Sequence, residues 1–160
     1  MYYRSATCFV IAILALTWAG GIIAQQRTFT FMDVQELRRA GSWAPRSDGT
    51  LMLYTTTTPD WAEASSQSDI HVVSLADGAS SSRRLTFTDD KNETQPTWAP
   101  GGSFFVFLSN RDSEESGNNQ LYMMRHDGGE AQKVTEAGEG VSGFDFSPDG
   151  QWLVYRSGES

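Results

Sequence analysis

The feature that most constrains the fold is a short motif that occurs three times. Each copy has an aromatic residue, Ala or Ser, Pro and a tight turn ending in Gly, followed by an apolar run. The copies span Trp43–Gly49, Trp98–Gly102 and Phe146–Gly150. Their prolines lie 55 and 48 residues apart, and self-similarity at such a period is typical of repeat units such as propeller blades. We therefore expect repeated units, with the chain ending inside the third.

The remainder of each unit repeats as well. The apolar run is followed by a loop, a second strand, an Asp-Gly or Asp-Gly-Gly turn, and a short basic strand that ends in an apolar residue and Thr. Asp-Gly and Gly-Gly favour two-residue hairpins, because the central positions of these turns need positive φ. The later strands expected are Ile70–Leu75 and Arg83–Thr86 in the first unit, and Leu121–Arg125 and Gln132–Thr135 in the second.

Each unit is thus predicted to be a four-stranded antiparallel meander of about 45–50 residues, the size of one propeller blade. The fold class is all-β: a partial β-propeller over residues 42–160, with two four-stranded antiparallel blades plus the start of a third, about 2.5 blades in all. The alternative is an ordinary β-sandwich, which also shows turn signals at regular spacing. A sandwich gives no reason for Trp-Ala-Pro to repeat in register, so the propeller is favoured.

Residues 1–24 have the layout of a secretory signal peptide. Arg4 opens a short positive region, an apolar run follows over Cys8–Ala19, and small residues lead to an expected cleavage site after Ala24. An uncleaved anchor is the alternative, since residues 6–24 approach the roughly 18–20 residues that span a bilayer. Cleavage would remove the one cysteine, and export without disulfides fits a bacterial periplasm or cell surface.

Residues 25–41 are expected to be an N-terminal segment with a short helix ahead of the blades. The signals of this helix are a capping residue at Thr30 or Asp33, an apolar face that includes Val34, and a stop at Gly41. A helix of this length is unstable alone, so we expect it to pack on another part of the protein.

The charge balance argues against a nucleic-acid partner. The chain has 12 basic and 20 acidic residues, and loss of Arg4 with the signal would leave 11 basic residues and a charge of about −9. Nucleic-acid binding rests on Lys and Arg that neutralise phosphates, so such a surface repels it. The basic pairs Arg38-Arg39 and Arg83-Arg84 are short and are expected to be solvated.

The sequence carries no recognisable catalytic motif. It lacks a Gly-x-Ser-x-Gly elbow, a His-Glu-x-x-His helix and a glycine-rich phosphate loop. His71 and His126 stand alone, so we expect structural or surface roles for both. Glu114-Glu115 could hold a cation or hard metal, but we expect a solvated loop tip. No catalytic, cofactor-binding or metal-binding residue is therefore predicted. The aromatic residues of the repeats are expected to be core residues packed between blades: Trp43, Trp98, Phe104, Phe107, Trp152 and Tyr155.

The order of motifs along the chain resembles the secreted prolyl oligopeptidase-family serine peptidases of the dipeptidyl and acylaminoacyl peptidase kind. Thr28–Arg39 is similar to the short helical segment that precedes the propeller in that family, and Tyr54–Trp61 continues the match. The blade signatures Ser-Pro-Asp-Gly and Asp-Gly-Gly-Glu are shared with periplasmic TolB-type propellers, whereas these two N-terminal runs favour the peptidases. Further matching runs are Ser68–Val73, Arg84–Thr86, Asn92–Trp98, Ser109–Asp112, Gln120–Met123 and Asp127–Ala131.

The resemblance implies a seven- or eight-bladed propeller that caps an α/β-hydrolase domain following it in the chain. The Ser, Asp and His of the catalytic triad lie in that later domain, so none of them is carried over to these 160 residues. Family members that cleave dipeptides hold the substrate amine with a Glu pair from a propeller insertion. Glu114-Glu115 lies in a different context, so that role is not transferred.

We therefore expect the N-terminal propeller fragment of an exported, periplasmic or extracellular serine peptidase, inactive alone, whose walls restrict access to the hydrolase domain. Peptide substrates would be reached through that missing domain, and a membrane only through an uncleaved signal segment. One alternative is a TolB-like periplasmic propeller that binds protein partners without catalysis. Another is a binding module assembled from several copies of this chain, since self-association is expected of an incomplete ring with an open apolar edge.

Overall fold

The computed structural model describes residues 28–113 and 118–158. The predicted signal peptide and Glu114-Glu115 lie outside the described residues. The chain divides into two compact units, Met1–Thr30 and Phe31–Ser160, and all the sheets belong to the second. Within the described residues, no helix combines the length and the apolar character needed to cross a membrane.

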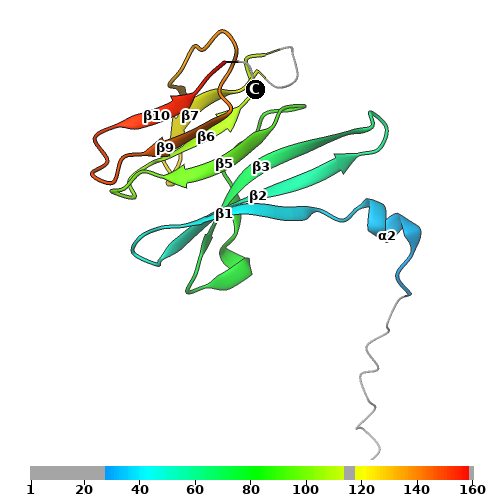
Figure 1. Cartoon of the computed structure of the whole chain (residues 1–160). Helices are drawn as coiled ribbons and strands as arrows, with labels where there is room; N and C mark the ends of the chain where they lie inside the picture. Colours follow the sequence, from blue (N-terminus) through cyan, green and yellow to red (C-terminus); the bar gives the residue numbers. More distant parts are fainter. Residues whose placement is uncertain (1–27, 114–117, 159–160) are drawn as a thin grey trace, which may run out of the picture. The chain divides into compact units, whose positions relative to one another are not determined.

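The first sheet is a four-stranded antiparallel meander in the order β1-β2-β3-β4 (Figure 1). The long hairpin of β2 and β3 is its centre, and the short β4 follows a 3₁₀ turn at Gly78–Ser81. The strands are β1 (Arg39–Pro45), β2 (Leu51–Asp60), β3 (Ser65–Ser74) and β4 (Arg83–Arg84).

The second sheet repeats the first in the order β5-β6-β7-β8, and a third, two-stranded sheet follows. The four-stranded meander predicted for each complete unit is thereby confirmed, as is the all-β class. The strands are β5 (Glu93–Trp98), β6 (Phe105–Ser109), β7 (Gln120–Met124) and β8 (Gln132–Lys133), then β9 (Gly143–Phe146) and β10 (Leu153–Arg156).

The hairpin between the first two strands of each unit has the same geometry in all three sheets. In each turn the backbone N–H of the first residue donates to the carbonyl five residues later, from Arg46, Ala99 and Ser147. Each turn ends in a glycine with a left-handed φ of 66° to 70°, a conformation that glycine adopts without steric cost. These glycines are Gly49, Gly102 and Gly150.

The strand pairing changes the alignment of the first sequence copy with the second by two residues. Pro45 pairs with Met52, just as Trp98 pairs with Phe105, so Pro45 rather than Trp43 occupies the position of Trp98. The reason is that the first copy has two more residues between its Pro and its Gly than the others. A bulge precedes this position in both four-stranded sheets, and its residues with positive φ are Ser42 and Gln95.

The hydrophobic core consists of two layers between successive sheets. Between the first and second sheets, Leu53 and Ile70 meet Trp98, Phe105 and their buried neighbours. Between the second and third sheets the buried members are Val106, Leu108, Leu121 and Val141, with Phe104, Phe144, Phe146 and Leu153 packed against them.

The N-terminal helix is shorter than predicted. The helix α2 spans Phe31–Gln35, whereas the sequence signals extended it to Gly41. Residues from Arg39 are instead drawn into β1, where Arg39, Ala40 and Gly41 pair with the Thr-rich end of β2. Pairing with an existing strand supplies hydrogen bonds that a free helical turn of this length cannot sustain.

Three of the six aromatic residues predicted to be core residues are exposed. Trp98 and Phe107 are buried and Phe104 packs in the second layer, as predicted. Trp43 and Trp152 are 76% and 69% exposed, and Tyr155 is also exposed. Trp43 and Trp152 lie on faces of the first and third sheets on which the described residues place no other sheet, so nothing buries them. Tyr155 pairs with Phe144 on the face that packs on the second sheet, yet it remains exposed near the end of β10.

Candidate functional site

The most distinctive surface of the molecule is the face of the first sheet that is turned away from the second sheet. Side chains alternate across a strand, so Leu53, Ile70 and Val72 point into the first core layer while Met52 and Tyr54 point the other way. We call the outward surface the leading face and define it by Trp43, Pro45, Met52, Tyr54, His71 and Val73.

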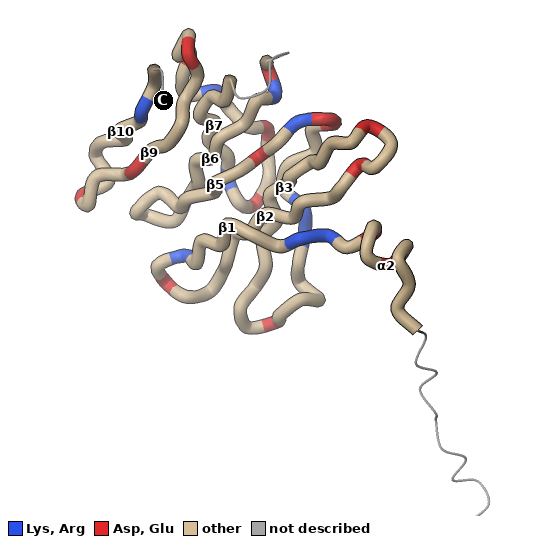
Figure 2. Tube along the Cα trace, turned by 45° about the vertical axis from the view of Figure 1, so that its right-hand side comes forward, with Lys and Arg blue, Asp and Glu red and all other residues tan. Residues whose placement is uncertain are grey.

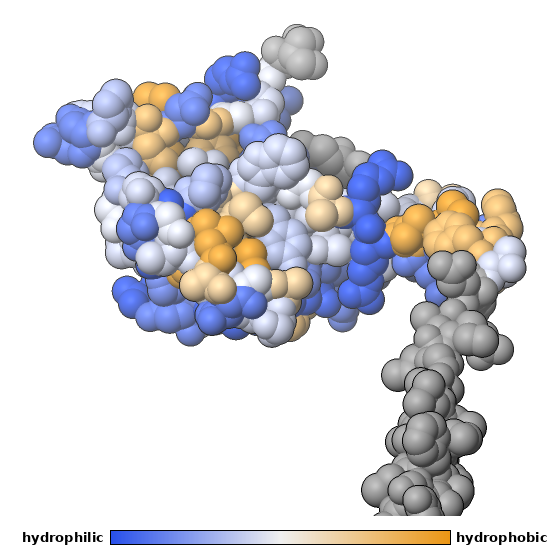
Figure 3. Space-filling view, turned by 90° about the horizontal axis from the view of Figure 1, so that it is seen from below, coloured by the Kyte–Doolittle hydropathy of each residue, from blue (hydrophilic) through white to orange (hydrophobic). Residues whose placement is uncertain are grey.

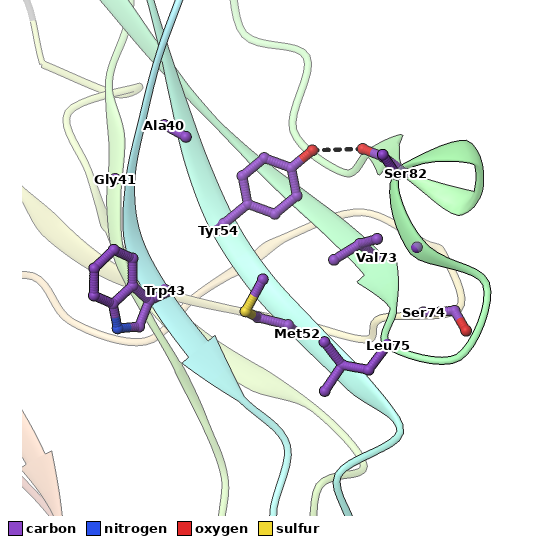
Figure 4. Close-up of a pocket in the computed structure, with 11 residues that line it drawn as sticks. Ala40, Gly41, Trp43, Met52, Tyr54, Val73, Ser74, Leu75 and Ser82 are labelled. Carbon is purple, nitrogen blue, oxygen red and sulfur yellow. Dashed lines mark hydrogen bonds between the residues drawn. The ribbon is translucent and has the colours of Figure 1, made fainter.

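The leading face holds an open, mostly apolar hollow of about 390 Å³. Trp43 and Met52 project into the same space, and the ring of Tyr54 closes one side of it (Figure 4). The Tyr54 and Ser82 hydroxyls form a hydrogen bond of 2.5 Å at its margin. In the view from below, a group of apolar side chains lies near the middle of the body among mostly polar ones (Figure 3). The remaining lining residues are Ala40, Gly41, Val73, Ser74, Leu75, Gly78 and Ala79.

His71 belongs to the packing of this face. Its ring stacks on Tyr54, with the ring centroids 5.3 Å apart. Burial lowers the pKa of His71, against the attraction of Asp69, and the guanidinium of Arg84 adds to the lowering. Arg84 is itself held by a 2.6 Å ion pair with Asp69. The imidazole therefore stays neutral near pH 7 and serves as a flat packing surface.

His126 lies at the junction of the first and second sheets. Its Nε2 is 3.0 Å from the Arg46 guanidinium, and its ring meets the ring of Trp98 edge to face at 5.6 Å. The indole N–H of Trp98 donates to the Ala44 carbonyl at 2.9 Å. Burial, followed by the charge of Arg46, lowers the pKa of His126. These contacts tie the turn of one sheet to the next.

Of the two basic pairs predicted to be solvated, Arg38-Arg39 is exposed as predicted, whereas Arg83-Arg84 also makes specific contacts. Arg83 donates to the His126 carbonyl across the junction between sheets, and Arg84 pairs with Asp69 while lying over the ring of Phe87 at 5.1 Å. Acidic and basic residues are interspersed over the loops around the sheets (Figure 2).

A buried carboxylate that sequence reasoning missed lies in the second sheet. Glu93 is fully buried and pairs with Arg111 at 3.2 Å, while the hydroxyls of Thr88 and Ser109 donate to the same oxygen. The Arg111 guanidinium lies over the Tyr122 ring, 4.7 Å from its centroid. The available signal was the presence of charged residues in both Asn92–Trp98 and Ser109–Asp112, two runs that meet at the open end of the β5–β6 hairpin, where Glu93 pairs with Ser109.

The same network extends to the surface through Tyr122. Its hydroxyl donates to Asp112 at 2.6 Å. This bond lowers the pKa of the Asp112 carboxyl, while burial raises that of the Tyr122 phenol. The other carboxylate oxygen of Glu93 has no hydrogen-bond partner within the described structure. The arrangement joins strands and contains no paired nucleophile and base.

A second hollow, of about 800 Å³, lies between the tip of the β2–β3 hairpin and the loops of the second sheet. Its lining is polar and of mixed charge, with Asp60, Glu63 and Asp90 beside Lys91 and the exposed Trp61. Among residues 28–113 and 118–158, no three His, Cys, Asp or Glu side chains gather closely enough to hold a metal ion.

Comparison with known proteins gives two related sequences. The uncharacterized peptidase YuxL of Bacillus subtilis is 34% identical over 108 residues, which are 67% of this chain and 15% of that protein. Dipeptidyl-peptidase 5 of Porphyromonas endodontalis is 24% identical over 157 residues, 96% of this chain and 22% of that protein. The chain's homologues are peptidases. The chain spans less than a quarter of the length of each, and no protein-family model matches it.

Solved structures place the fold among β-propellers. TolB from Acinetobacter baumannii superposes with a TM-score of 0.54 and 22% identity, over 75% of this chain and 27% of that chain. The β-propeller domain of the Trilobed protease from Pyrococcus furiosus gives a TM-score of 0.56 and 19% identity, over 80% of this chain and 35% of the other. At these identities the likeness is one of fold. The chain is thus a propeller portion related to peptidases.

Proposed function

We propose that this chain is the N-terminal propeller portion of an exported serine peptidase of the prolyl oligopeptidase family. In this role its sheets form part of a wall that restricts access to an active site in a hydrolase domain. Peptides would pass this wall and folded proteins would not. The observation that carries the proposal is the match to two peptidases, one of which is similar over 96% of this chain.

The structure supports a passive, wall-forming role. Successive sheets are joined by large aromatic side chains and by contacts between turns, such as that of Arg46 with His126. Interiors packed in this way transmit strain and resist deformation, which suits a rigid barrier. The buried carboxylates of the described residues, Asp69 and Glu93, are paired with Arg84 and Arg111.

The proposal is tested first by the sequence that follows Ser160 in the gene. A Gly-x-Ser-x-Gly elbow with a later Asp and His in the same reading frame would support it. An open reading frame that contains further blades and no such elbow would instead support the TolB-like alternative, in which the propeller binds protein partners and does no chemistry.

Activity gives a second test. We expect the 160-residue chain alone to leave dipeptidyl and aminoacyl reporter amides intact, because it carries no nucleophile elbow and its two histidines are engaged in packing. Hydrolysis that depends on the chain and is abolished by a serine-directed fluorophosphonate would contradict this expectation.

Export is tested with a segment of residues 1–30, which contains the expected signal and the residues that follow its expected cleavage site. Fused to alkaline phosphatase that lacks its own signal, this segment should give activity in the periplasm, and N-terminal sequencing should place the new terminus at Gln25. The control fusion replaces two central residues of the apolar run, Ile13→Arg and Leu14→Arg, and should remain in the cytoplasm. Activity that is equal for both fusions would contradict export by this segment.

A further inference from the structure

A third hollow, of about 450 Å³, lies where the first and second sheets meet. On the side of the first sheet its lining includes Leu51, Val73 and Arg83. On the side of the second sheet it includes His126 and Asp127, from the turn between β7 and β8. We call this space the junction hollow. Both of its sides belong to the first two sheets, so it does not depend on any further blade or domain.

The surroundings of His126 determine which of its ring nitrogens carries the proton. A guanidinium has donors only, so the Arg46 nitrogen 3.0 Å from Nε2 donates to it. Burial and the charge of Arg46 lower the pKa of His126, and the ring is therefore neutral near pH 7. A neutral imidazole whose Nε2 accepts carries its proton on Nδ1. Within residues 28–113 and 118–158, this Nδ1–H group has no acceptor.

The ring of His126 is held in place by its neighbours. It meets the ring of Trp98 edge to face, with the centroids 5.6 Å apart. Arg46, its partner at Nε2, is itself held by a 2.8 Å ion pair with Asp48. A donor whose orientation is already fixed loses little conformational freedom when a ligand binds. The Nδ1–H group is therefore a preorganised donor at the junction hollow.

Arg83 supplies a positive charge beside this donor. Its guanidinium donates to the backbone carbonyl of His126, so the guanidinium and the imidazole lie at the same residue. Arg83 forms no ion pair with any carboxylate in the described part of the chain. The other charged residue of the lining, Asp127, is paired at both carboxylate oxygens with Arg125, at 3.0 and 2.7 Å. The junction hollow thus has a guanidinium without a counter-charge and a neutral N–H donor.

We propose that the junction hollow binds a carboxylate carried on a short aliphatic body, as at the C-terminus of a peptide that ends in an aliphatic residue. A carboxylate has two acceptor oxygens, and its hydrogen bonds to a guanidinium are among the strong ones. Arg83 pairs with one oxygen and the Nδ1–H of His126 donates to the other. Leu51 and Val73 provide apolar contact for the aliphatic body. The volume of the hollow is at the lower end of the range for small-molecule sites, about 300–1,000 Å³.

Nuclear magnetic resonance of the isotope-labelled full chain tests this site with two probes of the same shape. N-acetyl-leucine carries the carboxylate, and N-acetyl-leucinamide replaces it by a neutral amide. At neutral pH and constant ionic strength, N-acetyl-leucine should shift the side-chain signals of His126 and Arg83 with saturation. The amide should leave both signals in place at the same concentrations. Equal shifts with the two probes, or no saturable shift with N-acetyl-leucine, would overturn the proposal.

A variant with a matched control assigns the binding to Arg83. Arg83→Gln keeps a donor for the His126 carbonyl but removes the charge, and it should weaken binding of N-acetyl-leucine about tenfold or more. Arg39→Gln removes the same charge at an exposed position on β1 and should bind as the parent does.

Two further results would contradict the site. One is an Arg83→Gln variant that binds as tightly as the parent, and the other is an equal loss in Arg39→Gln, which would show attraction by overall charge alone. If Arg83→Gln changes the backbone amide spectrum as a whole, Arg83→Lys takes its place. Lysine keeps the charge without the planar fork of donors, so this variant should also bind more weakly than the parent, and parental affinity would overturn the proposal.

Discussion

Trp43 and Trp98 each begin a Trp-Ala-Pro sequence, yet one side chain is exposed and the other is buried. Trp98 is 8% exposed between two sheets and donates its indole N–H to Ala44, whereas Trp43 is 76% exposed on the leading face. The difference arises from two extra residues in the first turn and from the absence of a described sheet in front of the first. It shows that a repeat motif indicates which side of a strand is apolar, while the neighbouring unit determines whether that side is buried.

The largest effect expected from this comparison is at the closed interface. Trp98→Ala empties a large aromatic site between the first two sheets, and such substitutions cost about 3–5 kcal/mol. Chemical denaturation of the parent and the variant measures the change in the free energy of unfolding. A denaturation midpoint equal to that of the parent would mean that Trp98 does not join the sheets.

A comparable effect is expected at the buried ion pair of the second sheet. Arg111→Met leaves the carboxylate of Glu93 buried without its counter-charge, and breaking such a pair by removing one partner costs about 3–5 kcal/mol. The matched control is Arg125→Met, which removes an ion pair to Asp127 whose side chains are both exposed; exposed pairs contribute about 0–1 kcal/mol. Equal losses in the two variants would contradict the burial of Glu93.

A smaller effect is expected from pH at the junction around His126. Its pKa is lowered in the folded state by burial, then by Arg46, with Arg83 and Arg125 adding and Asp127 opposing. The unfolded chain therefore binds the proton first, at its ordinary pKa of about 6.5. The stability due to neutral His126 is complete above that value and declines as pH falls through it towards the folded pKa.

The variant His126→Gln isolates this contribution, because Gln keeps an acceptor for Arg46 and does not titrate. Denaturation at about pH 7.5 and about pH 5.5, on either side of the unfolded pKa, should show a larger loss of stability for the parent than for the variant. An equal loss in both would mean that His126 titrates normally in the folded protein.

The smallest effect is expected at the open face. Trp43→Ala, measured on dilute protein, should change the free energy of unfolding by no more than about 0.5 kcal/mol, as is usual for exposed positions. A loss as large as that of Trp98→Ala would show that the leading face of the first sheet is covered within a single chain.

The sequence was sufficient to predict the strand order of each unit, but not which faces of the sheets are buried or where the helix α2 ends. The meander of each unit was accessible, because turn residues and strand patterns are local signals. Burial was not, since Trp43, Trp152 and Tyr155 have the same local pattern as buried residues and differ only in what packs on them. The end of α2 was missed because Arg39, Ala40 and Gly41 gain a pairing partner sixteen or so residues away.

The candidate site was accessible only in part. The isolation of His71 and His126 from catalytic motifs could be seen in the sequence, but their ring contacts, stacked on Tyr54 and edge to face with Trp98, depend on how the strands and sheets are placed. The ion pair of Glu93 with Arg111 joins the start of β5 to the turn that follows β6, so the two charged residues were visible in the sequence but their pairing was not. The leading face became recognisable only when the hairpin turns were aligned by their hydrogen bonds.

The central claim is that successive repeat units pack as blades, with Trp98 as the contact between the first two. The most direct measurement is the nuclear Overhauser spectrum of the ¹⁵N-labelled full chain, observed at the tryptophan indole N–H groups. The account predicts cross-peaks from the Trp98 indole proton to Ala44 and slow exchange of that proton with solvent. A Trp98 indole proton that shows no contact with Ala44 and exchanges as fast as that of Trp43 would contradict it.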